Sequence, residues 1–170
     1  MQKSRFSPRQ MALAGIIAGI YTALTYFLPI PQYGGVQLRA AEAMTLLPFL
    51  FPEATLGLTV GCFLANVLGS PYVLDWVFGT LATFLAANLT RRMPNKFLAA
   101  VPPVVCNALI VGAEIAYFSV LDGEAFLPAF AFNACTVGLG ELIACFALGV
   151  PLVSWMQKNS YMREFMMKKR

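Results

Sequence analysis

The chain has 170 residues, of which 59% are hydrophobic and 12% charged, with a formal net charge of +4. A soluble domain carries about 25% charged residues, so the composition excludes an ordinary water-soluble protein and predicts one all-α membrane domain over residues 1–170. The chain has no histidine, which excludes Ser-His and Cys-His nucleophile pairs and any histidine metal site.

Six apolar segments follow one another along the chain, and prolines, glycines or charges separate them. A helix needs about 20 apolar residues to cross a bilayer. We expect spans at residues 8–28, 38–51, 52–68, 73–90, 99–120 and 126–156. Two prolines, Pro29 and Pro31, stop the first span, and Pro52 opens the third, because proline fits the first turn of a helix.

The basic residues predict the orientation of these spans. Eleven of the twelve lie in three segments at or beyond the ends of the spans: Lys3, Arg5 and Arg9; Arg91, Arg92 and Lys96; Lys158, Arg163, Lys168, Lys169 and Arg170. Lys and Arg mark the cytoplasmic side of a membrane protein, and six crossings place all three segments there. The pattern predicts a multi-pass protein of a cell membrane with cytoplasmic N- and C-termini. It also accounts for the net charge without a nucleic-acid partner.

The twelfth basic residue, Arg39, stands three positions before Glu42 at the outer end of the second span. Residues three apart face each other on a helix. They form either a local ion pair that closes the helix end or part of an outward-facing pocket, since charges inside a membrane usually face a cavity.

Asp75 and Trp76 open the fourth span, and Asn66 lies at a similar depth in the third. Here the alternatives are a carboxylate stabilised by the helix dipole beside an aromatic interfacial anchor, or a second wall of the same pocket.

The fifth and sixth spans each carry one Asn and one Glu. Asn107 and Glu114 are seven apart and share a helix stripe, while Asn133 and Glu141 flank one face. An Asn in a membrane helix usually bonds to a neighbouring helix.

The expected spans contain four acids, Glu42, Asp75, Glu114 and Glu141, and Arg39 is the one base at a similar depth. A cationic ligand would balance that excess, and protonation of the acids is the alternative.

The first span contains Ala14-Gly15-Ile16-Ile17-Ala18-Gly19, with both AxxxA and GxxxG spacings. Small residues four apart allow another helix to approach closely in a membrane. The partner helix belongs either to this chain or to another protein.

The stretch VQLRAAEAMTLLP at residues 36–48 resembles the queuosine-precursor transporter family (QueT-type), which are substrate-binding S components of energy-coupling factor (ECF) transporters. Further similar blocks are PEA at 52–54, GLTVGCFLAN at 57–66, LD at 74–75, FGTLAT at 78–83, NALIVGAE at 107–114 and GLGEL at 138–142.

The resemblance implies a six-helix S-component bundle that binds a deazaguanine precursor of queuosine, either the aminomethyl form or queuine. The expected binding residues are Gln37, Arg39, Glu42, Asn66, Asp75, Trp76, Asn107, Glu114, Asn133 and Glu141. The resemblance also implies that Ala14 and Ala18 dock a transmembrane coupling subunit and that two cytoplasmic ATPases supply the energy. We expect no cofactor, no metal ligand and no catalytic residue.

Two alternatives remain open on the sequence. One is an S component for another small vitamin or a purine-like base. The other is an intramembrane enzyme, such as an aspartyl-type protease in which two buried acids share a proton, although the sequence has no paired-aspartate motif.

Overall fold

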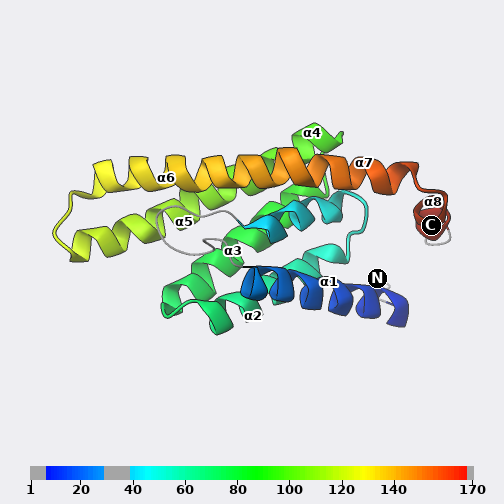
Figure 1. The fold of residues 1–170 in the computed structure, drawn as a ribbon, viewed down its shortest axis with the longest axis horizontal. Coiled ribbons are helices and arrows are strands. Elements are labelled where there is room, and N and C mark those ends of the chain that lie inside the picture. The colour runs from blue at the N-terminus through cyan, green and yellow to red at the C-terminus, as the bar shows by residue number, and fades with distance from the viewer. Residues whose placement is uncertain (1–6, 29–38, 168–170) are drawn as a thin grey trace, which may run out of the picture.

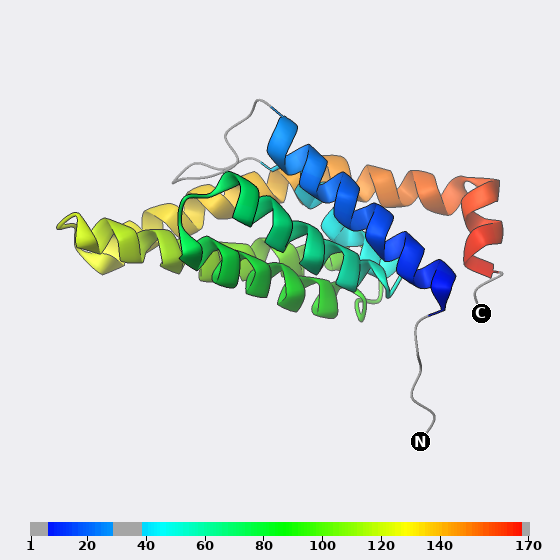
Figure 2. The same cartoon turned by 90° about the horizontal axis from the view of Figure 1, so that it is seen from below.

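The computed structural model of the chain describes residues 7–28 and 39–167, and the regular elements in that part are all helices (Figure 1). They are α1 (Pro8–Phe27), η1 (Ala40–Phe49), α2 (Ala54–Gly69), α3 (Val73–Thr90), α4 (Lys96–Ala99), α5 (Val101–Leu121), α6 (Phe126–Leu142), η2 (Ile143–Gly149), α7 (Val150–Lys158) and α8 (Ser160–Met167). The start of α1 and the crosswise α8 lie at the same end of the molecule (Figure 2).

Within residues 7–28 and 39–167, four helical stretches are long and apolar enough to cross a membrane: Pro8–Phe27, Val73–Thr90, Lys96–Leu121 and Phe126–Lys158. The last consists of α6, η2 and α7 joined end to end, as one long rod (Figure 1). The helix α2 is apolar but has 16 residues. The predicted all-helical membrane class therefore agrees with the structure, while the count of six crossings and the single domain over residues 1–170 stay predictions.

Local sequence signals account for the limits of α1. Ser7 caps the helix, and its side chain and that of Gln10 bond reciprocally to each other's backbone N–H, which is a capping box. Leu28 follows the helix in an extended conformation, as expected for a residue before proline. The predicted first span and α1 agree to within one residue.

The predicted second span, residues 38–51, forms the 3₁₀ helix η1 instead of an α-helix. A 3₁₀ helix rises about 2.0 Å per residue, so its ten residues extend about 20 Å, which is less than the roughly 30 Å of a bilayer core. Eight of the ten are buried, and η1 packs against η2, α3 and α1. This segment lies inside the protein, surrounded by helices from both halves of the chain.

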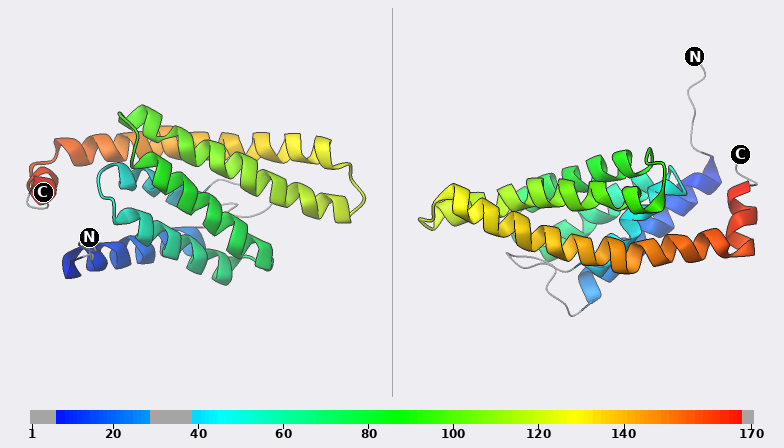
Figure 3. Two further views of the ribbon diagram at one scale, coloured as in Figure 1. Left: turned by 180° about the vertical axis from the view of Figure 1, so that it is seen from behind. Right: turned by 90° about the horizontal axis from the view of Figure 1, so that it is seen from above.

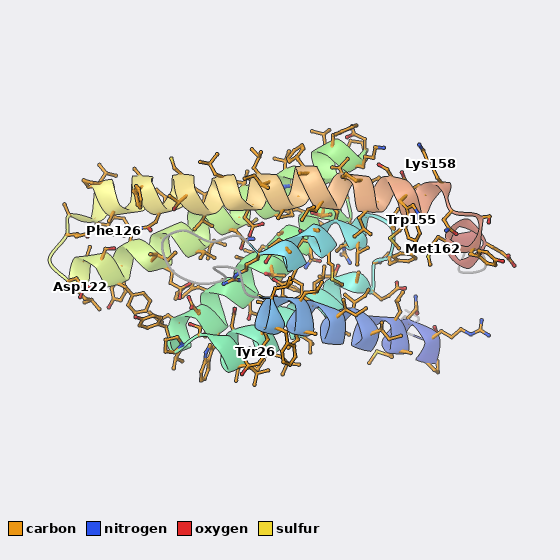
Figure 4. The ribbon with its side chains drawn as sticks, viewed as in Figure 1. Tyr26, Asp122, Phe126, Trp155, Lys158 and Met162 are labelled. Carbon is orange, nitrogen blue, oxygen red and sulfur yellow. The ribbon has the colours of Figure 1, made fainter. Side chains whose placement is uncertain are left out.

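The remaining contacts follow chain order. The helix α1 packs on α2, α2 on α3, α3 on α5, and α5 on α6. Figure 3 shows α5 and α6 running antiparallel side by side, while the α2–α3 pair diverges from them. Asp122 and Phe126 lie at one end of the molecule, and Trp155, Lys158 and Met162 lie at the other (Figure 4).

The contact between α1 and α2 is a close backbone approach. A Cβ placed on Gly57 would lie 2.6 Å from the Ala14 carbonyl oxygen, and one on Gly61 would lie 2.9 Å from that of Ala18. Ala14 and Ala18 are therefore buried against a helix of their own chain. On the exposed side of α1, a methyl group added to Gly15 or Gly19 would meet no described atom within 4 Å.

We expect Gly57→Ala to lower the midpoint of thermal unfolding in detergent, because its methyl group must push α1 away from α2. Overpacking of this kind costs about 1–3 kcal/mol. The matched control is Gly15→Ala on the open face of α1, which adds the same methyl group without a clash. Equal midpoints for the two variants would contradict the close approach.

Candidate functional site

Buried charged side chains gather around Arg39, which is 7% exposed at the start of η1. Its guanidinium interacts electrostatically with the carboxyl groups of Glu42, Glu114 and Glu141. These acids come from η1, α5 and α6. The structure therefore brings together Arg39 and three of the predicted acids, although Glu141 lies more than a hundred residues after Arg39.

Glu42 is held from two sides. It is 1% exposed, and the Tyr21 hydroxyl group on α1 donates a hydrogen bond to its Oε1 atom. The Glu42 backbone N–H also donates to the Arg39 carbonyl oxygen, at 3.0 Å. Its Oε2 atom is buried and receives no hydrogen bond from the described part of the chain. Glu42 thus joins η1 to α1 as well as to Arg39.

Glu141 lies where α5, α6 and η2 meet, with Asn107 facing it from α5. The Cys145 Sγ atom is 3.9 Å from Glu141 Oε2 and 3.7 Å from the Glu42 carbonyl oxygen. The Thr45 hydroxyl group lies 3.6 Å from the same sulfur. These contacts fix η1 against the last long helix.

The fourth acid, Asp75, faces Glu114 between α3 and α5. Ser70 donates a hydrogen bond to Asp75 Oδ2. Glu114 is 5% exposed, and neither of its carboxyl oxygens receives a hydrogen bond from a described residue. A half-buried carboxyl group and a buried one therefore face each other, an arrangement that favours a cation or a shared proton.

Glu114 also lines a cavity of about 610 Å³, which is within the usual size of small-molecule sites. The other lining residues are Leu74, Phe78, Leu109, Ile110, Ala113, Tyr117 and Phe126. They come from α3, α5 and the start of α6, and Phe126 marks that end of the molecule in Figure 4. The cavity is thus apolar and aromatic except for one carboxyl group.

The other predicted binding residues have contacts of their own. The Asn66 Nδ2 atom donates to the Asp75 carbonyl oxygen at 2.9 Å, and Trp76 Nε1 donates to the Ser70 carbonyl oxygen at 3.3 Å. Both therefore hold the turn that carries Asp75. Asn133 donates to the Ala129 carbonyl oxygen of its own helix at 2.8 Å. Gln37 lies outside the described residues.

Several site residues were not found from the sequence. Tyr21 belongs to the buried stripe of α1 that includes Ala14, Ile17 and Ala18, so its three- and four-residue spacing could have indicated it. Ser70 stood in an expected turn. The aromatic side chains of the cavity carry no sequence signal, because which face of α5 borders a cavity depends on how α3 and α5 diverge.

Comparisons with known proteins agree with the transporter resemblance. The sequence model of one family, described as QueT transporter, matches residues 11–158. The chain is 29% identical over 84 residues to the queuosine precursor transporter QueT of Lactococcus lactis subsp. cremoris (strain MG1363). That alignment covers 48% of this chain and 49% of the relative, so the match spans about half the length of the curated protein. No solved structure matches the chain.

We expect Tyr21→Phe to lower the thermal unfolding midpoint in detergent, because it removes the donor to a buried carboxyl group. An unsatisfied buried acceptor costs about 1–3 kcal/mol. The matched control is Tyr26→Phe on the same helix, where the side chain is 50% exposed (Figure 4). A Tyr21 variant as stable as the Tyr26 variant would show that the Glu42 contact does not stabilise the fold.

Proposed function

Because the chain belongs to the QueT transporter family, we propose that it is the membrane subunit that binds a queuosine precursor for uptake into a bacterial cell. The observation that carries this proposal is the buried Glu114 carboxyl group, which has no hydrogen-bond donor among the described residues and lines an apolar, aromatic cavity. Such a cavity suits a flat heterocycle that carries hydrogen-bond donors or a positive charge.

The chemistry of a deazaguanine precursor fits this surrounding. Its guanine-like edge carries N–H donors, and the aminomethyl form adds an ammonium group; both bond well to carboxylates. Its flat ring can pack on aromatic side chains, which the cavity supplies at Phe78, Tyr117 and Phe126. The excess of acids over the one guanidinium of Arg39 supports a cationic ligand over an anionic vitamin.

We further propose that the chain acts as the S component of an ECF transporter, with a transmembrane coupling subunit and two ATPases as partners. Docking through α1 is part of this proposal. Ala14 and Ala18, which the family resemblance places at that contact, are buried against α2. The surface of α1 that remains open to a partner helix is the side that carries Gly15 and Gly19.

The proposed location is the bacterial cell membrane, with the N- and C-termini in the cytoplasm. The start of α1 and Lys158 lie at one end of the molecule, and the acidic loop at Asp122 lies at the other (Figure 4). This separation of charge supports the orientation predicted from the basic residues.

Calorimetric titration of the detergent-solubilised chain tests the ligand. We expect the aminomethyl-deazaguanine base or queuine to bind at least about tenfold more tightly than guanine. A tenfold difference in affinity corresponds to about 1.4 kcal/mol, and one good charge pair contributes more binding free energy than that.

The same titration separates the alternatives. Tight binding of guanine with no preference for either precursor would favour a purine-base transporter instead. A folded protein that binds none of the three compounds would overturn the proposed substrate class.

A further inference from the structure

We propose that the four acids are not equivalent, and that the Asp75–Glu114 pair is the subsite that recognises a primary ammonium group on a flat heterocyclic ligand. This inference rests on the proposed function. It assigns Glu42 and Glu141 a different role, which is to hold η1, together with Arg39, inside the helices.

The partners of Glu42 and Glu141 lie within the protein. Glu42 accepts a hydrogen bond from Tyr21, and Glu141 lies beside Cys145 and Asn107. Both interact with Arg39. Their carboxyl groups are therefore already part of a network that joins α1, η1, α5 and η2. Of the four acids, only Glu114 lines the cavity of about 610 Å³, and Asp75 interacts with Glu114 from the neighbouring helix α3.

The surroundings of Glu114 differ. It interacts with another carboxyl group, that of Asp75, and the Arg39 guanidinium that also acts on it is shared with Glu42 and Glu141. Ser70 donates to one oxygen of Asp75, and both oxygens of Glu114 remain without a donor in the described part of the chain.

An ammonium group supplies what this pair lacks. It has three N–H donors and one positive charge, enough to bond both carboxyl groups at once and to offset their mutual repulsion. A neutral donor of the same size brings no positive charge, so the pair would still need a shared proton. The pair therefore distinguishes an amine from an isosteric alcohol by charge.

The cavity defines the rest of the ligand. Apart from Glu114, its lining side chains are aliphatic or aromatic, with Phe78 on α3 and Tyr117 on α5. A ring that lies against these side chains would bring a short side arm to Glu114, whose carboxyl group interacts with that of Asp75. The ligand class is thus a flat base with a primary amine on a one- or two-atom arm.

The test compares two ligands on the full-length chain in detergent: the aminomethyl-deazaguanine base and its hydroxymethyl analogue, which has the same size and no charge. For the unsubstituted protein we expect the amine to bind at least about 30-fold more tightly, because loss of one partner of a buried charge pair costs about 2 kcal/mol or more. Glu114→Gln and Asp75→Asn should each reduce this ratio to within about threefold of unity.

Asp122→Asn is the matched control, since it removes one carboxylate from an exposed loop at the same end of the molecule. Its amine-to-alcohol ratio should equal that of the unsubstituted protein. Thermal unfolding of each variant shows whether it is folded, and the Asp75 variant tests the same subsite if the Glu114 variant does not fold.

The outcomes separate the two proposals. If the unsubstituted protein binds both bases and the ratio survives in both variants, or is lost in Glu42→Gln instead, the ammonium subsite is overturned while the proposed function stands. If the folded, unsubstituted protein binds neither base, the proposed function fails and the subsite with it.

Discussion

One buried positive charge organises the interior of this protein. A guanidinium group surrounded by apolar helices is very costly unless acids accompany it. Arg39 meets this requirement through Glu42, Glu114 and Glu141, which belong to η1, α5 and α6. The same electrostatic contacts therefore connect an early segment of the chain to its two last long helices. Because one guanidinium serves several acids, the proposed ligand or bound protons would have to balance the remaining carboxyl groups.

Much of the fold could be predicted from the sequence, since apolar runs, prolines and basic clusters are local signals. The limits of α1, α3 and α5 agree with the predicted spans to within two residues. The 3₁₀ form of η1 could not be predicted in this way, because Ala and Leu favour an ordinary helix and Pro48, near the end of the segment, indicates only where an α-helix would stop. Its conformation depends on the helices that bury it.

The site was predictable in composition and less so in arrangement. Charges inside apolar spans are rare, so the sequence indicates Arg39 and the four acids as candidates. Their partners are not indicated, because Tyr21 and Cys145 look like ordinary buried residues until the helices are assembled. The roles of Ala14 and Ala18 likewise depend on packing: a small-residue spacing indicates a close helix contact but does not say which helix makes it.

The position of η1 has a consequence for biosynthesis. Cys145 contacts the Glu42 carbonyl oxygen and the Thr45 hydroxyl group. The segments that η1 packs against therefore include η2, which is synthesised about a hundred residues later. Until η2 has left the ribosome, a short segment with an arginine and a glutamate has no complete protein surroundings, and lipid does not accept such groups readily. We therefore expect η1 to reach its final position only after the last long helix is made, although η1 is synthesised much earlier.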